Sequence, residues 1–495
     1  MKEKRTSVVR VGLINFSLRL LGAPISFAFS YIVAHYLSRI DLTLFGLWQS
    51  VFVYITGLFS IPATSISNVT SKIAAEGRGV GGLILVNLAI GGVSGLAYVL
   101  LQPYLIPASS NLDPSAVELA VMMLLVYYLL TSSNAVARGR TPTVVGVSAI
   151  TFQLVRLGFL LYAFFMLKMT ILGVVLAYTL GYLSQIAVNV GFVRANFSLD
   201  RQATIEGLKA AVVLSVAYLQ YMLEASLVWL ANWLTQSTVP ASYFESAMIV
   251  TNVVFWASSL SDGLIKRFTE SKDPSDLTIA LKLLASAGSL VLVLDLVGLY
   301  PLLYYIRPEY TASLVIAVIL ALSNFARMAF MTYYYALIAL DTTLGKSLKG
   351  PMGTMLLYNV VFAVFPLSVV SVVLLLVSRG LIEVRGLTDQ PWFFGLVMAL
   401  AMLTNSVLMV MNAHQVTNRI VKVMFPSRSF LNAAVAVTIA VGPFLPVSFV
   451  SSISKAIVIE LSAGLLYILV SYLIDDYTRL LVVRTLQEIK RVIFR

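Results

Sequence analysis

Cysteine is absent from this sequence, and histidine occurs only as His35 and His414. Without cysteine the chain has no disulfide, no thiolate metal ligand and no cysteine nucleophile. Two histidines argue against a histidine-based metal centre. Charged residues are also few, at 11% of the 495 residues. We therefore expect no metal site and no cofactor.

Apolar residues are correspondingly abundant. They make up 59% of the chain, and the mean hydropathy is +0.92. A soluble globule needs far more polar surface to cover its core, so the composition predicts an all-α polytopic membrane protein. Windows of about 20 apolar residues, the length that crosses a bilayer as a helix, predict about 14 transmembrane helices. Their approximate ranges are 11–37, 43–66, 80–104, 115–136, 142–166, 170–192, 208–234, 240–262, 278–303, 311–338, 351–377, 391–412, 430–449 and 456–474.

The positions of Lys and Arg predict the orientation in the membrane. With the amino terminus inside, the inner segments hold 24 of the 34 basic residues and the outer loops hold six. This bias satisfies the positive-inside rule and places both termini in the cytoplasm of a multi-pass protein of the plasma membrane. It also explains the net charge of +12 through contact with anionic lipid headgroups, so we expect no nucleic-acid partner. The other four basic residues fall within the spans and are Arg19, Arg156, Lys282 and Arg327.

Two inner segments repeat each other. SNVTSKIAAEGR (67–78) aligns with SDGLIKRFTESK (261–272) at one fixed offset, which matches Lys72 with Lys266. Such a repeat predicts two six-helix lobes of the same orientation, as in transporters built from parallel repeats. Chance similarity between two charged loops is the alternative. The expected units are an amino-terminal lobe at 1–194, a carboxy-terminal lobe at 207–412, two additional helices at 430–474 and a basic cytoplasmic tail at 475–495.

The segment VGLINFSLRLLGAPISFAFSYIVAHYLSRIDLTLFGLWQSV (11–51), followed by NVTSKIAAEGR, resembles the opening of the polysaccharide-biosynthesis flippases. These lipid-linked oligosaccharide flippases belong to the multidrug/oligosaccharidyl-lipid/polysaccharide (MOP) transporter superfamily. The family's first outer loop carries a leucine, an acidic residue and an aromatic-glycine pair, here Leu37, Asp41 and Phe45-Gly46. The segment ARGRTPTVVGVSAITFQLVRLGF is similar to the family's junction of helices 4 and 5. The carboxy-terminal half matches less clearly.

The resemblance implies a transporter rather than an enzyme. Its substrate would be a polyprenyl or dolichyl (pyro)phosphate-linked oligosaccharide, which a monomeric flippase moves across the membrane by alternating access. A cation-coupled exporter of small amphipathic molecules, from the multidrug branch of the superfamily, is an alternative in which acidic residues would dominate the cavity. A membrane enzyme of lipid-linked glycan assembly is the third, but the sequence has no long catalytic loop for it.

Polar side chains within the spans are the candidate site, because ionisable groups in a membrane must face protein or water. Arg19 shares a helical stripe with Asn15 and Ser26, while Arg156 follows Gln153 by three residues. Arginines lining a wet cavity suit an anionic headgroup, because the guanidinium fork matches phosphate oxygens. The residues predicted to bind substrate are Arg19, Arg156, Arg327, Asn15, Ser26 and Gln153.

Two acidic residues lie at mid-depth, Glu224 and Asp295. They are candidates for binding a coupling cation or proton. They are equally candidates for neutralising the intramembrane arginines, because buried charges need partners. The sequence favours neither role.

Overall fold

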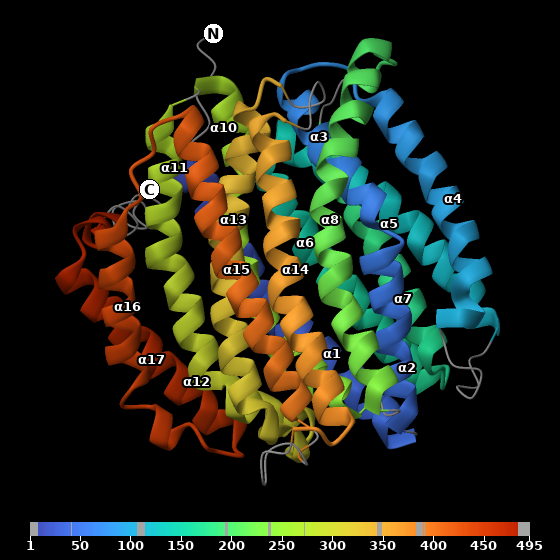
Figure 1. The fold of residues 1–495 in the computed structure, drawn as a ribbon, viewed down its shortest axis with the longest axis vertical. Helices are drawn as coiled ribbons and strands as arrows, with labels where there is room; N and C mark the ends of the chain where they lie inside the picture. The colour runs from blue at the N-terminus through green and yellow to red at the C-terminus, as the bar shows by residue number, and fades with distance from the viewer. Residues whose placement is uncertain are drawn as a thin grey trace.

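The computed structural model of the 495-residue chain describes residues 8–40, 42–105, 114–193, 197–235, 239–271, 273–343, 349–382, 390 and 392–483. These residues form helices joined by short connections, with no strand among them (Figure 1). The all-helical fold class that hydropathy predicts is confirmed.

The part of the chain predicted to be the amino-terminal lobe contains helices of unequal regularity. Pro142 at the first position of α6 starts that helix, where a missing N–H costs nothing. A π-helical turn, η1, divides the second span. The elements are α1 (Val8–Ile40), α2 (Leu42–Val53), η1 (Tyr54–Leu58), α3 (Ile61–Ala75), α4 (Gly81–Leu105), α5 (Pro114–Arg140), α6 (Pro142–Leu161), η3 (Tyr162–Met166) and α7 (Ile171–Phe192).

The carboxy-terminal lobe follows a short connection. Asp200 caps its first helix by accepting the Ala203 N–H, and Asp273 caps α11 by accepting the Ser275 N–H, both at 2.9 Å. The elements are α8 (Arg201–Thr235), α9 (Val239–Phe255), η4 (Trp256–Ser261), α10 (Leu264–Ser271), α11 (Pro274–Leu283), η5 (Leu284–Gly288), α12 (Ser289–Ile306), η6 (Pro308–Ser313), α13 (Leu314–Leu340), α14 (Pro351–Ser378) and α15 (Phe393–Ile420).

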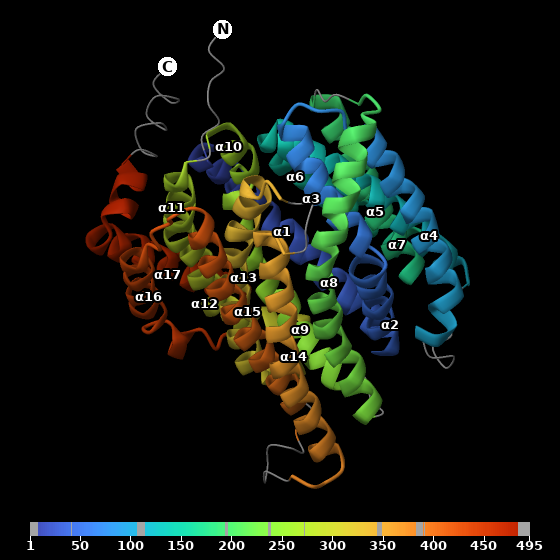
Figure 2. The ribbon, with the colours of Figure 1, turned by 45° about the horizontal axis from the view of Figure 1, so that its top comes forward.

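The last part of the described chain consists of α16 (Ser427–Val441), η7 (Leu445–Val447) and α17 (Ile453–Ile474). Figures 1 and 2 show α16 and α17 at one edge of the molecule beside α12, on the side away from α4. Ala436 and Ala440 of α16 and Ala463 of α17 are buried in a cluster with Val293 and Val297 of α12. Small residues at these positions let helices approach closely in a membrane.

Twelve segments of the described chain are long and apolar enough to cross a membrane. Two further predicted spans are less regular: the second is divided into α2, η1 and α3, and the thirteenth is α16, with 15 residues. Together they account for the prediction of about 14. The predicted lobe boundaries stay a prediction, and α8 begins at Arg201, before the predicted 207. Residues 484–495 of the predicted tail lie outside the described residues.

Large apolar side chains cover the outer surface of the bundle. Leu96 on α4 is 62% exposed, Phe365 on α14 is 71% exposed and Leu465 on α17 is 68% exposed. Exposure of this kind over many helices matches contact with lipid rather than water.

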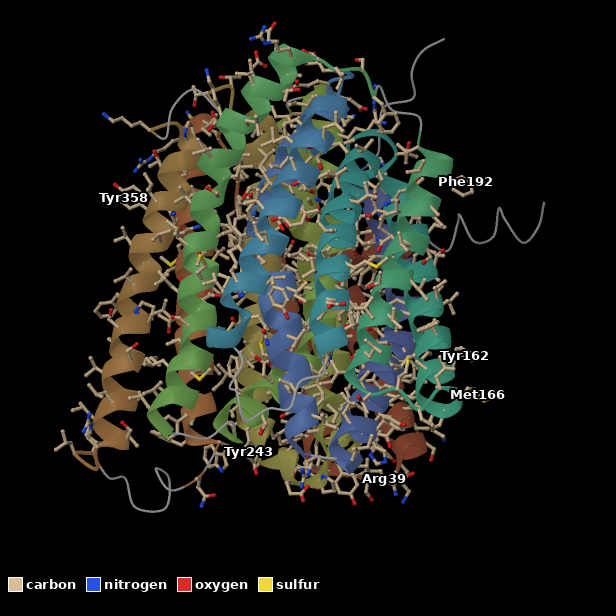
Figure 3. The ribbon with its side chains drawn as sticks, turned by 90° about the vertical axis from the view of Figure 1, so that its right-hand side faces the viewer. Arg39, Tyr162, Met166, Phe192, Tyr243 and Tyr358 are labelled. Atoms are coloured by element: carbon tan, nitrogen blue, oxygen red, sulfur yellow. The ribbon has the colours of Figure 1, made fainter. Side chains whose placement is uncertain are left out.

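The two ends of the bundle carry alternate loops, as the predicted topology requires. Figure 3 shows Arg39, Tyr243 and Met166 toward one end, and Phe192 and Tyr358 toward the other. The end at which α1 begins, where α10 lies, is called the inner end here. That it faces the cytoplasm stays a prediction from the basic residues.

Candidate functional site

Arg156 is a buried arginine near the middle of the span formed by α6 and η3, and it is 5% exposed. Its Nη2 donates a hydrogen bond to Ser26 Oγ on α1 at 3.2 Å and to Gln153 Oε1 on α6 at 2.5 Å. Gln153 and Arg156 are three residues apart, so both project from one face of α6. The structure thus brings together three of the residues predicted to bind substrate.

Three aromatic rings surround the same guanidinium. Its central carbon, Cζ, lies 3.9 Å from the ring centroid of Phe29 and 4.7 Å from the centroids of Phe152 and Tyr178. A cation over a ring face gains about 0.5–2 kcal/mol per contact. Phe29 and Tyr178 also pack edge to face, 5.2 Å between centroids. The rings come from α1, α6 and α7 and hold the guanidinium in one place.

The charge of Arg156 has no acidic counterpart in the described part of the chain. No carboxylate there forms a salt bridge with it, and its Nε has no hydrogen-bond partner. An uncompensated cation inside a membrane is costly, so this position favours an anion. Ser26 and Gln153 are only half-buried, which leaves the polar side of the site accessible.

Two other predicted ligands of α1 lie nearer its inner end. Arg19 lies within α1, but its side chain is outside the described residues. Asn15 is fully buried, and its Nδ2 donates to the Pro142 carbonyl at 2.8 Å and to Asp262 Oδ2 at 3.2 Å. It lies about 16 Å from Ser26 along α1, at a rise of about 1.5 Å per residue. The amide of Asn15 therefore bonds to protein groups between the lobes, away from Arg156.

Arg327 on α13 is paired, in contrast to Arg156. Its Nη2 lies 2.6 Å from Glu224 Oε2 on α8, and its Nε donates to Ser406 Oγ at 3.1 Å. Asn405 Nδ2 donates to the other oxygen of Glu224 at 2.5 Å. All four side chains are buried. The geometry is that of a charge and its counter-ion, while roles in binding cargo or a coupling ion stay predictions.

Asp295 on α12 belongs to neither cluster. It is 2% exposed, and neither of its carboxyl oxygens has a hydrogen-bond partner among the described residues. Its titratable neighbour is Glu460 on α17. Of the two acidic residues predicted at mid-depth, the structure pairs Glu224 with an arginine and leaves Asp295 without a donor.

The lobes are joined at the inner end by polar contacts. Lys72 Nζ on α3 donates to the Asp341 carbonyl at the end of α13, and Lys266 Nζ on α10 donates to the Arg140 carbonyl at the end of α5, both at 2.9 Å. A cation is favourable at a helix carboxyl end, where carbonyls have no intrahelical partner. Each lysine thus reaches from its own lobe to a helix end of the other.

These two lysines are the pair that the sequence repeat aligns. Their bonds are reciprocal, because α3 and α5 belong to one lobe and α10 and α13 to the other. We call these two bonds the lysine latch. The two aligned segments also lie side by side, because α3 is in contact with α10, while the division into two lobes stays a prediction.

Further contacts support the latch. Asn68 Nδ2 donates to the Tyr334 hydroxyl at 3.1 Å, and Arg138 Nε lies 3.9 Å from Asp262 Oδ1. Gly12 packs directly on the backbone of Leu260, where a Cβ would collide with the Leu260 carbonyl. The inner end is therefore closed by close backbone approach as well as by side chains.

The connection between the lobes is held at the same end. Arg78, just after α3, has its Nη1 2.7 Å from Glu206 Oε2 on α8, and its Nε 3.7 Å from Asp200. The hydrogen bond that Arg78 donates to Glu206 raises the pKa of the Arg78 guanidinium above its ordinary value, so this arginine stays charged across the physiological range.

Removing both lysines of the latch is expected to open the inner end. A hydrogen bond to a charged group contributes about 1.5–3 kcal/mol, so a Lys72→Ala, Lys266→Ala variant should raise the open population by about tenfold or more. Because the chain has no cysteine, spin labels can be attached at cysteines placed at Glu76 and Glu270. Double electron–electron resonance between them should show an added population at longer distance.

Lys209→Ala is the matched control, because Lys209 is an exposed lysine on α8. It should leave the distance distribution unchanged. A latch variant with the same distribution as the control would show that the lysines do not hold the inner end closed.

The sequence missed the aromatic part of the Arg156 site. Phe29, Phe152 and Tyr178 come from three helices, and aromatic residues are common in every span. A usable signal existed on α7, where Tyr178, Tyr182 and Gln185 follow one another at helical spacing on one buried face.

No family model matches the chain, and no curated protein matches it. Its fold is similar to solved structures of transporters. One, described as the outward-facing conformation of a multidrug resistance MATE family transporter of the MOP superfamily, has a TM-score of 0.62 at 13% identity and covers 84% of this chain and 99% of that one. A structure of MATE in complex with MaD3S has a TM-score of 0.60 at 14% identity and covers 83% and 97%.

A third similar structure is a MOP superfamily transporter from Pyrococcus furiosus Vc1 (DSM3638). Its TM-score is 0.61 at 14% identity, and it covers 84% of this chain and 97% of that one. Its description states that the reverse polarity of its binding pocket suggests a different function for that transporter. At these identities the similarity shows the fold alone. The chain therefore has the fold of the MATE transporters of the MOP superfamily.

Proposed function

We propose that the protein is a flippase for a lipid with an anionic, phosphate-bearing head, of the class of polyprenyl or dolichyl (pyro)phosphate-linked oligosaccharides. It works by alternating access of the two lobes and carries out no covalent chemistry. We further propose that it acts as a monomer in the plasma membrane. The distribution of basic residues supports an orientation with both termini in the cytoplasm.

The observation that carries this proposal is the unpaired charge of Arg156. Two polar side chains hold its guanidinium and three aromatic rings flank it, yet no carboxylate neutralises it in the described part of the chain. A phosphate head would supply the missing charge and accept several N–H donors at once. The Nε–H of Arg156, which has no hydrogen-bond partner among the described residues, could donate to an oxygen of such a head.

Alternating access is supported by where the lobes contact each other. The latch, the Asn15–Asp262 bond and the contact of Gly12 with Leu260 all lie at the inner end. A cycle that breaks these contacts and closes the opposite end would move cargo from one side to the other.

A cation-coupled exporter of amphipathic molecules is the second candidate, because one similar structure is a multidrug resistance transporter. That function needs acidic side chains free to meet a cation. Glu224 does not offer one in this conformation, because Arg327 occupies its carboxylate. Asp295 has no donor among the described residues, but it lies at the contact of α12 with α17, apart from Arg156. Another similar structure is described with a pocket of reverse polarity, so a different charge preference is compatible with this fold.

The test is transport by the purified protein in proteoliposomes. Three fluorescent cargoes are compared: a polyprenyl-phosphate sugar, the same lipid with a neutral head, and a lipophilic cation. We expect movement of the phosphate lipid well above protein-free vesicles, with little movement of the other two. Transport of the cation alone would favour the exporter and overturn the flippase.

A further inference from the structure

A pair of carboxyl groups lies between the carboxy-terminal lobe and the last helix, apart from the Arg156 site. Asp295 on α12 is 2% exposed, and both of its oxygens lack a hydrogen-bond partner among the described residues. Glu460 on α17 acts on it electrostatically. Glu460 Oε1 rests against α12 at Gly298, where a Cβ would lie only 2.5 Å from that oxygen. Gly298 is three residues after Asp295, so the two carboxyls border the same turn of α12.

The surroundings of the pair are apolar. The contact between α12 and α17 is built from Val293, Val297 and Ala463, and Gly464 packs on Leu294. Both acidic residues lie within membrane spans. An ionised carboxylate in such a place, without a donor, is strongly disfavoured. Two carboxylates close together cannot both ionise readily, and one of them then retains a proton.

Among the described residues, no basic side chain forms a salt bridge with either carboxyl group. Arg327 on α13 is occupied by Glu224, and Glu309 on η6 is paired with Arg307. Tyr467 on α17 donates to the Ser286 carbonyl. Besides Asp295 itself, the described acidic, basic and histidine side chains on the elements packed against α12 are His35 and Arg39 on α1, Glu245 on α9, Arg327 on α13, Glu309 on η6, Arg428 on α16, and Lys455 and Glu460 on α17, and the tyrosines there include Tyr310 on η6 and Tyr467 and Tyr472 on α17.

The chemistry of the site favours a proton over a metal cation. Sodium or calcium needs about six oxygen ligands, whereas this site offers four carboxyl oxygens among Val, Leu, Ala and Gly residues. One proton between two carboxyl groups needs no further ligand.

We propose that Asp295 and Glu460 form a proton-binding site at the contact between α12 and α17, in which the pair holds one proton. The site lies outside the cargo site and does not depend on the cargo that the protein carries. The strength of the contact between α17 and α12 would then depend on whether the pair is protonated. Loss of the proton would place two like charges across this contact and weaken it.

Infrared difference spectroscopy tests the site directly. The full chain in lipid nanodiscs, without cargo, is titrated with base while the C=O stretch of protonated carboxyl groups is recorded. We expect this band to persist at pH values at which exposed carboxyl groups, with ordinary pKa values of about 4, are ionised. Asp295→Asn should weaken the band, and the double variant Asp295→Asn, Glu460→Gln should remove the contribution of the pair.

Two further variants make the assignment specific. Glu460→Gln keeps the shape of the side chain but removes its charge, and Gly298→Ala displaces the Glu460 carboxyl without deleting it. Both should shift the pH range over which the band is lost. Glu118→Gln, which removes an exposed carboxyl on α5, should change nothing.

Three results would overturn the proposal: a band that is unchanged in the double variant Asp295→Asn, Glu460→Gln, a titration that is the same in Glu460→Gln and Gly298→Ala as in the original chain, or loss of the band on adding sodium at fixed pH. Because no cargo is present, failure here is separate from failure of the flippase proposal in the transport assay.

Discussion

Replacing Arg156 by glutamine is expected to abolish most transport of the phosphate-headed lipid while leaving the protein folded. Truncating one partner of a buried, hydrogen-bonded charge pair costs about 2–5 kcal/mol of binding, which is a weakening of about 30-fold or more at about 1.4 kcal/mol per factor of ten. The new amide would keep one donor for Ser26 but lose the charge. Initial rates in proteoliposomes measure the effect.

The thermal stability of the same variant separates a ligand role from a structural one. Arg156 has no salt bridge with a carboxylate among the described residues, so removing its charge leaves no opposite charge unpaired. This relief of a buried charge offsets the loss of the cation–π contacts, and the melting temperature should change little. Stabilisation by added phosphate lipid should disappear. Arg156→Lys should give intermediate transport, because it keeps the charge without the planar fork.

A matched control is available in Arg307→Gln, which removes a partly exposed arginine paired with Glu309. It should transport at the original rate. Wild-type transport by the Arg156→Gln variant would contradict the proposed role, whereas a large loss of stability without loss of lipid binding would make Arg156 a structural residue.

The sequence predicted the membrane architecture well because it depends on quantities that are local along the chain. Apolar windows predicted the positions of the spans, whereas the two lobes that the alignment of Lys72 with Lys266 predicts stay a prediction. Departures from regular α-helix within a span could not be predicted from apolar windows. The π-helical turn at Tyr54–Leu58 has no composition of its own to distinguish it from an α-helix.

The candidate site was predicted only in part, because contacts between helices depend on how far each is rotated and shifted. Arg156 and Gln153 share one helix face, so their proximity was readable, and Ser26 was found through its own stripe. The sequence could not tell that Arg156 faces aromatic rings while Arg327 faces Glu224, 103 residues away. It treated the two arginines alike, although their electrostatic surroundings differ.

Glu224→Gln should show the opposite behaviour to Arg156→Gln. Arg327 would lose the carboxylate that lies 2.6 Å away, and removing one partner of a buried ion pair costs about 3–5 kcal/mol of stability. Equilibrium unfolding in mixed micelles should show a loss of that size. Asn405 would also lose the charged acceptor of its hydrogen bond, which adds to the effect.

The double variant Glu224→Leu, Arg327→Met distinguishes a counter-ion from a coupling site. Replacing both charges with apolar residues of similar volume is often neutral or stabilising, so it should recover much of the stability that Glu224→Gln loses. If Glu224 serves only as the counter-ion of Arg327, the double variant should also retain its response to a pH gradient across the vesicle. A Glu224→Gln variant as stable as the original chain, but unresponsive to that gradient, would make Glu224 the coupling residue instead.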